Sequence, residues 1–132
     1  MEKGSFPSAM AELDEGFLPV VDKIRAALLE LDGKIKITGH TDNNPIKTSQ
    51  FRSNWDLSSA RALSVMHELI KKEGLKPSRF EIVGSADTKP IAPNDTPENR
   101  SRNRRVDIEL IQKESKDKNS DEQDSILNEL AE

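Results

Sequence analysis

The chain has 132 residues, of which 33% are apolar and 33% are charged, so it can build one modest core. Its formal net charge of −4 comes entirely from residues 113–132, which carry three lysines and seven acidic residues. The preceding residues are therefore neutral in sum and offer no global basic field for nucleic acid. Cysteine is absent, which excludes a disulfide framework, a thiolate metal site and a thiol nucleophile.

Targeting and membrane-spanning signals are also missing from the sequence. The apolar runs are too short to span a bilayer, and the first residues do not form a secretory signal. If the protein works outside the cytoplasm, we expect this chain to be a fragment whose anchoring segment lies upstream.

An apolar stripe predicts a first helix. Pro19 is tolerated only in the first turn, so this helix should begin near residues 16–18, and Gly33 should end it. Residues 1–12, before it, are small and polar and have room for a short edge strand around Phe6. The stripe recurs at three- and four-residue steps: Phe17, Val20, Val21, Ile24, Leu28 and Leu31.

A period of two then predicts a half-buried strand over residues 34–39, in which isoleucines alternate with lysines. After a polar connection, Ser53 and Asp56 have the spacing of a capping box. A second helix is expected to follow it through Lys72.

Two more strands are predicted at 79–83 and 105–111, separated by a loop at 84–100 that contains three prolines. Helices that alternate with strands indicate an α/β (α+β) two-layer sandwich, with a β-α-β-α-β core and the helices on one face of a small mixed sheet. We expect one domain over 13–111 and a charged, disordered tail over 112–132.

Two charged residues are the main candidates for a ligand site. Asp42 lies just past a strand end, where loop side chains are accessible. Asn54 and Arg61 share one face of the second helix, about 20° apart. This face borders the apolar stripe, so we expect Arg61 to be neither deeply buried nor mobile. Together Asp42 and Arg61 suit a zwitterionic ligand, although the spacing alone favours a plain surface ion pair between them.

The other candidates are weaker. His40 and His67 lack a third ligand at metal spacing, so neither is expected to bind a metal. The basic run at 100–105 could contact phosphate, but the aromatic platform of a single-strand binder is missing. No nucleophile motif accompanies Ser58 and Ser59. The sequence therefore predicts no catalysis.

Three segments in register resemble the OmpA-like domain: ITGHTD at 37–42, NWDLSSARA at 54–62 and NRSRNRRVDI at 99–108. The resemblance runs from about residue 12 to 111. It implies a domain that binds peptidoglycan without cleaving it and without a cofactor or metal. Asp42 would receive the ammonium of a diaminopimelate in the peptide stem, and Arg61 its carboxylate. The remaining site residues that the resemblance implies line or brace the same groove: Thr41, Asn54, Leu57, Asn103 and Arg104.

Within that family the chain is most similar to the flagellar stator subunits MotB and PomB, because the link between the first two motifs carries FRSNWDLS at 51–58. This resemblance implies a periplasmic domain of an inner-membrane protein, a homodimer, and a channel-forming partner of the MotA/PomA type. The alternatives are the same domain in an outer-membrane protein or a Pal-type lipoprotein, a wall-processing enzyme, and RNA binding through residues 100–105.

Overall fold

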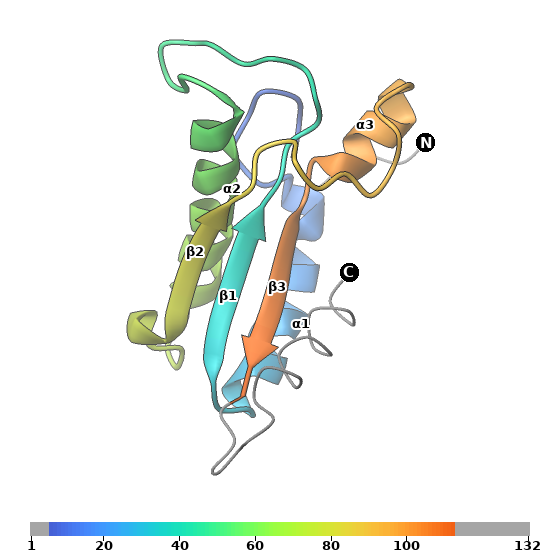
Figure 1. The fold of residues 1–132 in the computed structure, drawn as a ribbon. Coiled ribbons are helices and arrows are strands. Elements are labelled where there is room, and N and C mark those ends of the chain that lie inside the picture. The colour runs from blue at the N-terminus through green and yellow to red at the C-terminus, as the bar shows by residue number, and fades with distance from the viewer. Residues whose placement is uncertain (1–5, 113–132) are drawn as a thin grey trace, which may run out of the picture.

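The computed structural model describes residues 6–112. Two helices, α1 and α2, cover one face of a three-stranded sheet, and a short third helix, α3, lies beyond one end of it (Figure 1). The predicted two-layer architecture is thereby confirmed. In chain order the elements are η1 (Glu15–Phe17), α1 (Leu18–Leu29), β1 (Lys34–Gly39), α2 (Asn54–Ile70), η2 (Pro77–Arg79), β2 (Phe80–Gly84), α3 (Pro97–Asn103) and β3 (Val106–Ile111).

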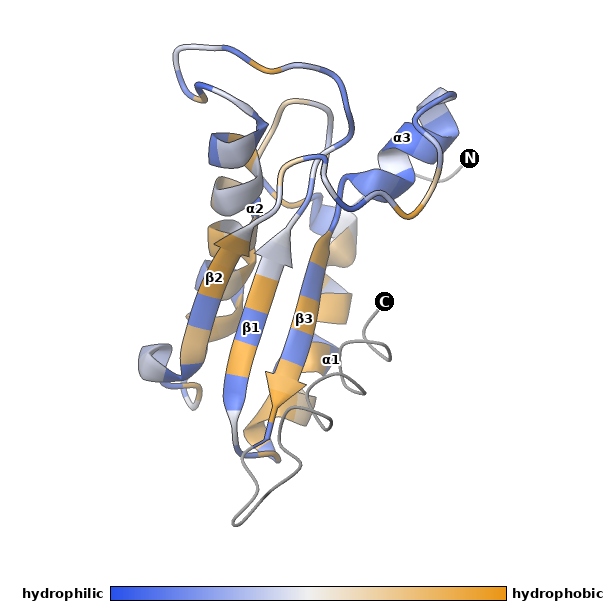
Figure 2. Cartoon of the chain, in the orientation of Figure 1, coloured by the Kyte–Doolittle hydropathy of each residue, from blue (hydrophilic) through white to orange (hydrophobic). Residues whose placement is uncertain are grey.

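The sheet is mixed and has the order β2-β1-β3. β1 pairs with β2 in parallel and with β3 in antiparallel orientation, so Ile37 of the central strand lies between Ile82 and Ile108. Because side chains alternate along a strand, one face of the sheet is apolar and the other is polar. Figure 2 shows this alternation along β1 and β3.

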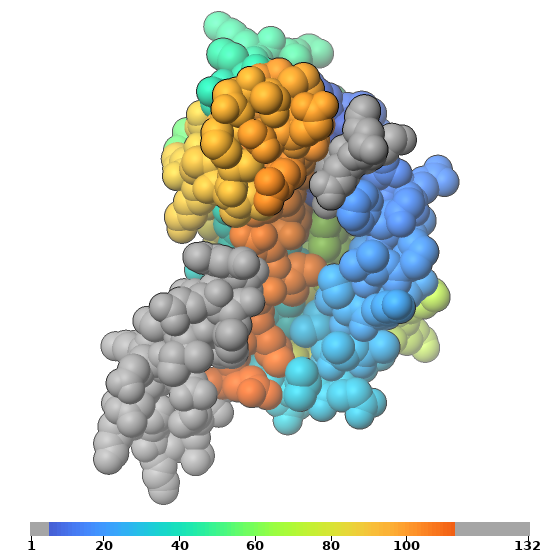
Figure 3. Space-filling view, turned by 90° about the vertical axis from the view of Figure 1, so that its right-hand side faces the viewer, coloured from blue at the N-terminus to red at the C-terminus, as the bar shows by residue number. Residues whose placement is uncertain are grey.

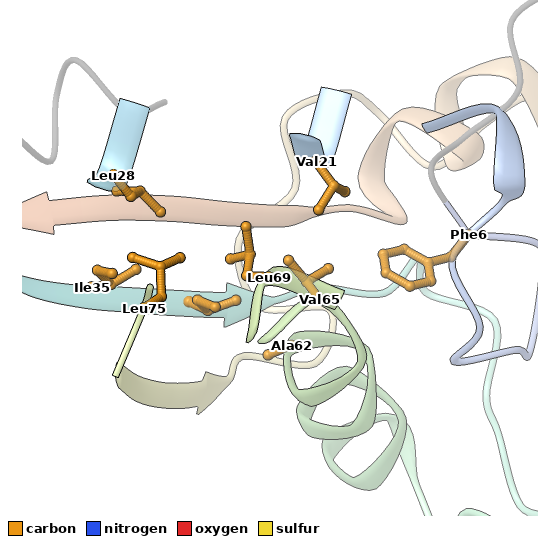
Figure 4. Close-up of a cluster of buried hydrophobic side chains, with 9 residues drawn as sticks. Phe6, Val21, Leu28, Ile35, Ala62, Val65, Leu69 and Leu75 are labelled. Atoms are coloured by element: carbon orange, nitrogen blue, oxygen red, sulfur yellow. The ribbon is translucent and has the colours of Figure 1, made fainter. Parts of the chain in front are cut away.

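The core lies between the apolar sheet face and the two helices (Figure 4). Ile35 and Ile37 are fully buried, and Leu69 of α2 packs against them. Phe6, far from these elements in sequence, belongs to the same cluster, which ties the start of the described chain to the core. The buried members are Phe6, Val21, Leu28, Ile35, Ile37, Ala62, Val65, Leu69 and Leu75.

The predicted start of α1 is confirmed, but its end and part of its apolar stripe are wrong. α1 ends at Leu29, and the left-handed Gly33 (φ 129°) lies beyond it. Leu31 therefore leaves the stripe and is 42% exposed, while Val20, on the outer side of the helix, is 48% exposed. A buried arginine takes a place on the inner face: Arg25 donates to the carbonyls of Leu69 and Glu68 at the end of α2.

The cap of α2 differs in detail from a reciprocal capping box. Ser53 Oγ accepts from the N–H of Trp55, as expected of a cap residue. Asp56 Oδ2, however, accepts from the N–H and Nε of Arg52, one residue before the cap. The helix start and the strand boundaries at 34–39, 79–83 and 105–111 are otherwise confirmed within one residue.

Two predicted features need correction. The edge strand around Phe6 does not form in residues 6–12, because Pro7 lacks an N–H and Ala9 adopts a left-handed conformation (φ 61°). The loop at 84–100 ends in a helix, α3, which Thr96 caps and Pro97 opens. The predicted tail, apart from Gln112, lies outside the described residues. Among residues 6–112 no helix is long and apolar enough to cross a membrane.

Candidate ligand-binding site

The candidate site lies beyond the carboxyl end of β1. Two glycines let α2 approach this end of the sheet closely. A Cβ on Gly39 would stand 1.9 Å from the carbonyl oxygen of Ser58, and one on Gly84 would stand 2.1 Å from Ser59 Oγ. The Ser58 hydroxyl also accepts from the N–H of Ala86, which joins α2 to the loop after β2. The residues that follow β1 are therefore held against the first turns of α2.

Asp42 is buried at this point, with 5% of its surface exposed, contrary to the prediction that it is accessible on a loop. Its Oδ1 accepts from the N–H of Asn44, and its Oδ2 accepts from Nη1 of Arg104 at 3.0 Å. Arg104 follows α3, 62 positions away in sequence. The ion-pair partner of Asp42 is therefore Arg104, and the surface pair between Asp42 and Arg61 does not form.

Arg61 is completely buried, contrary to the prediction that it is not deeply buried. Its guanidinium donates to the carbonyls of Met10 (2.8 Å), His40 (3.1 Å) and Pro7 (3.0 Å), and it stacks over Phe6 at 5.2 Å. Burial, and then the charge of Arg104, lowers the pKa of Arg61 to about 10, against an opposing effect of Asp42. Arg61 therefore remains charged at neutral pH, and the charges of Arg104 and Asp42 both act on it.

The Phe6–Met10 segment covers this arginine. Besides receiving two bonds from Arg61, it accepts from Nε of Arg104 through the carbonyl of Phe6, at 2.9 Å. Figure 3 looks from the side of β3 and shows the α3 region and the N-terminal part of the described chain near the same end of the domain. Two guanidinium groups therefore fix the N-terminal segment over the site.

The other predicted site residues divide into two groups. Thr41, whose N–H donates to Ala86, and Asn54, whose Nδ2 donates to the carbonyl of Asn44 at 3.1 Å, hold the loops on either side of Asp42. Leu57, in the first turn of α2, is buried, with 1% of its surface exposed. Asn103 acts elsewhere: its amide binds the backbone of Ile91 and Ala92, so it braces the loop after β2 rather than lining the groove.

A second charged cluster lies on the sheet face that α1 and α2 do not cover, and it includes His40, the first residue after β1. Nε2 of His40 is 3.0 Å from Oδ2 of Asp107, and Arg105 contacts the same carboxylate at 3.2 Å. Burial alone would raise the pKa of Asp107, but the bonds and charges of His40 and Arg105 outweigh it and lower this pKa. Within residues 6–112 no group of three His, Asp or Glu side chains is placed to hold a metal ion.

The sequence did not reveal the two long-range partners in this site. The Phe6–Met10 segment contributes backbone carbonyls, which leave no sequence signal. Arg104 was expected only to line or brace the groove, because nothing local relates it to Asp42. No sequence signal points to this pairing, because the position of Asp42 after a strand predicted an accessible carboxylate and not a buried one.

Comparisons with known proteins match most of the chain. Residues 6–104 match the model of the OmpA family. Motility protein B of Bacillus subtilis (strain 168) is 40% identical over 107 residues, which cover 80% of this chain and 41% of that relative. The chain therefore spans about two fifths of the length of this curated relative.

Two solved structures extend the comparison to the fold. The C-terminal domain of Helicobacter pylori MotB has 29% sequence identity and a TM-score of 0.72, with 100% of this chain and 98% of that chain covered. The cell wall anchor of the T6SS from Pseudomonas aeruginosa has 44% identity and a TM-score of 0.67, with 76% and 70% covered.

Proposed function

Since this chain belongs to the OmpA family, we propose that it is a non-catalytic domain that binds peptidoglycan and anchors a flagellar stator to the cell wall. The 40% identity to a motility protein and the likeness to a cell wall anchor both support this proposal. Since the chain spans only part of the motility protein, stator function is proposed for the longer protein and wall binding for this domain.

The observation that carries the proposal is the buried pair of Asp42 and Arg104, joined at 3.0 Å, with the charged Arg61 beside it. One carboxylate and two guanidinium groups converge here, which suits a ligand with an ammonium and a carboxylate close together. The free end of diaminopimelate in a peptide stem has this chemistry. Its ammonium would bind the carboxylate of Asp42. Its carboxylate would bind the guanidinium groups of Arg104 and Arg61.

Ligand binding would exchange partners rather than fill an empty site. The Asp42–Arg104 ion pair would separate, and Asp42 would pair with the ligand's ammonium while Arg104 pairs with its carboxylate. No charge would therefore remain unpaired. A guanidinium has five N–H donors, and Arg61 uses three of them on carbonyls. Two donors remain for a ligand carboxylate, but the side chain is covered. Direct contact with Arg61 would therefore require a shift of the Phe6–Met10 segment.

The wider assembly follows from the same proposal. We infer a periplasmic location, an inner-membrane anchor in another part of the protein, a homodimer, and a channel-forming partner of the MotA type. An OmpA-family domain of an outer-membrane protein or lipoprotein would bind the same ligand. The similarity to motility protein B favours the stator.

The proposal is tested by sedimentation with purified peptidoglycan. Wild-type protein is expected to pellet with the wall, and Asp42→Asn is expected to stay in solution while keeping its fold by circular dichroism. Asp32→Asn is the matched control, because Asp32 is exposed and precedes β1 at the opposite end of the sheet. Release of soluble fragments by the wild type, or pelleting of Asp42→Asn to the wild-type extent, would refute the proposal.

A further inference from the structure

The turn after β2 lies between α2 and the backbone that leads to Asp42. Because β1 and β2 are parallel, the chain leaves both strands at the same end of the sheet (Figure 1). The N–H of Ser85 donates to the carbonyl of Gly39 at 3.0 Å. The carbonyl of Ala86 accepts from the N–H of Thr41 at 2.9 Å. Asp42 is the next residue, so the turn after β2 bears directly on its backbone.

Ala86 adopts a backbone conformation that residues with a Cβ rarely adopt. Its φ is 53°, in the left-handed region, and the residue is 1% exposed. This conformation is strained for an alanine and persists only where surrounding contacts hold it. Within residues 6–112 the only other non-glycine residue with a positive φ is Ala9, in the Phe6–Met10 segment that covers Arg61. Both strained positions therefore adjoin the candidate site, and strain of this kind clusters at functional sites.

Ser58 of α2 holds Ala86 in this conformation. Ser58 is completely buried, and its hydroxyl donates its one proton to the carbonyl of Trp55 at 3.1 Å. It therefore meets the N–H of Ala86 as an acceptor, at 3.0 Å. A Cβ on Gly84 would stand 2.8 Å from Ser58 Oγ, which shows how closely the turn approaches this hydroxyl. Both polar backbone groups of Ala86 are thus bound, one by α2 and the other by Thr41.

We propose that Ser58 and Ala86 are positioning residues for Asp42. The inference rests on the proposed function for the ligand, and neither residue is assigned a contact with it. The contacts run from the hydroxyl of Ser58 through the backbone of Ala86 to the N–H of Thr41. The hydroxyl of Thr41 then donates to the carbonyl of Asp42 at 2.8 Å. Without the bond from Ser58, Ala86 would leave the left-handed region and withdraw its carbonyl from Thr41.

Such positioning matters because the proposed binding step removes one support of the Asp42 carboxylate. Oδ2 binds Arg104 in the described structure, and the ammonium of the ligand would replace this arginine. Of the side-chain contacts of Asp42 within residues 6–112, the bond from the N–H of Asn44 to Oδ1 would then remain. The contacts that end at Thr41 therefore help to decide the direction of the carboxylate. Hydrogen bonds weaken steeply with misalignment, so this direction affects the affinity.

The test compares the binding of free diaminopimelate by the wild type, Ser58→Ala, Ala86→Gly and the double variant in calorimetric titration. Ser58→Ala should weaken binding at least about fivefold, the range of one impaired bond to a charged group. Ala86→Gly should leave the affinity unchanged, because glycine adopts the left-handed conformation readily. The double variant should recover most of the affinity lost in Ser58→Ala, since glycine reaches this conformation without the bond from the hydroxyl.

Ile35→Val is the matched control for a loss of stability without a loss of positioning. It removes one methyl group from the core at the start of β1, at the opposite end of the strand from Asp42 (Figure 4). It should leave the affinity unchanged, and circular dichroism checks that every variant is folded. Equal affinities of Ser58→Ala and Ile35→Val would overturn the inference. A loss in Ser58→Ala that the double variant does not recover would also overturn it.

Hydrogen exchange of the Thr41 and Asn44 amides separates this inference from the proposed function, because it needs no ligand. The two amides report the bond to Ala86 and the bond to the Asp42 carboxylate. Both should exchange faster in Ser58→Ala than in Ile35→Val, and the double variant should restore the slower rates. A wild type that does not bind diaminopimelate would refute the proposed function. The exchange rates would then decide the positioning role alone, and equal rates in Ser58→Ala and Ile35→Val would overturn it.

Discussion

Arg104 binds the carboxylate of Asp42 with Nη1 and the carbonyl of Phe6 with Nε, so one side chain joins the candidate site to the start of the described chain. Arg61 also binds the start of the described chain, through the carbonyls of Pro7 and Met10. The Phe6–Met10 segment is therefore held by the same guanidinium groups that a ligand carboxylate would need. Ligand binding and the position of this segment should be coupled.

The Asp42–Arg104 pair should contribute to stability. Arg104→Gln is expected to lower the free energy of unfolding by about 1–3 kcal/mol, because it leaves a buried carboxylate with one backbone donor. Urea denaturation measures this loss. In the double variant with Asp42→Asn the two losses should be clearly less than additive. Strict additivity would show that the two groups do not interact in solution.

Arg61 should be more costly to replace. Arg61→Met keeps the bulk of the side chain but leaves three carbonyls without their donor, so we expect a loss of about 3 kcal/mol or more. Limited proteolysis of the folded variant should show faster cleavage within residues 6–12. Equal cleavage rates in variant and wild type would contradict the role of Arg61 in holding this segment.

Asp107 should make stability depend on pH in the acid range. Its pKa is lowered in the fold from the ordinary value of 3.8, so its contribution is present above that value and is lost as the pH falls through the lower, folded-state pKa. Asp107→Asn should therefore lose less stability than wild type between pH 7 and about pH 3. Denaturation curves at both pH values measure the difference, and parallel losses would contradict it.

Gly39 should tolerate no side chain. Gly39→Ala is expected to destabilise the domain by at least about 2 kcal/mol, because its Cβ would lie 1.9 Å from the backbone of α2. Gly16→Ala is the control, since the nearest atom there is at 3.5 Å, an ordinary contact. Thermal unfolding of both variants tests the argument, and a similar midpoint for the two would oppose it.

Periodicity was sufficient to predict the elements whose side chains pack locally. The alternation around Ile35 and Ile37 and the helical spacing of Ala62, Val65 and Leu69 follow from which face each element buries, and the structure confirms them. α3 was missed because three prolines suggested a loop. The signal was present in Thr96-Pro97, a cap followed by proline at the first helical position.

The candidate site was only partly predictable, for a physical reason. The position of Asp42 just past β1 follows from the strand pattern. The burial of Arg61 does not, because it depends on carbonyls 51 and 54 positions away. Backbone acceptors carry no residue-specific signal, so their contacts appear only in the folded chain.

Calorimetric titration of the wild type, Asp42→Asn and Asp32→Asn with free diaminopimelate tests the central claim most directly. The account predicts saturable binding by the wild type and by Asp32→Asn, and affinity at least about tenfold lower for Asp42→Asn, as expected for a lost charge-assisted contact. Equal affinity of all three proteins would show that the ligand does not use Asp42, and it would contradict the assigned site.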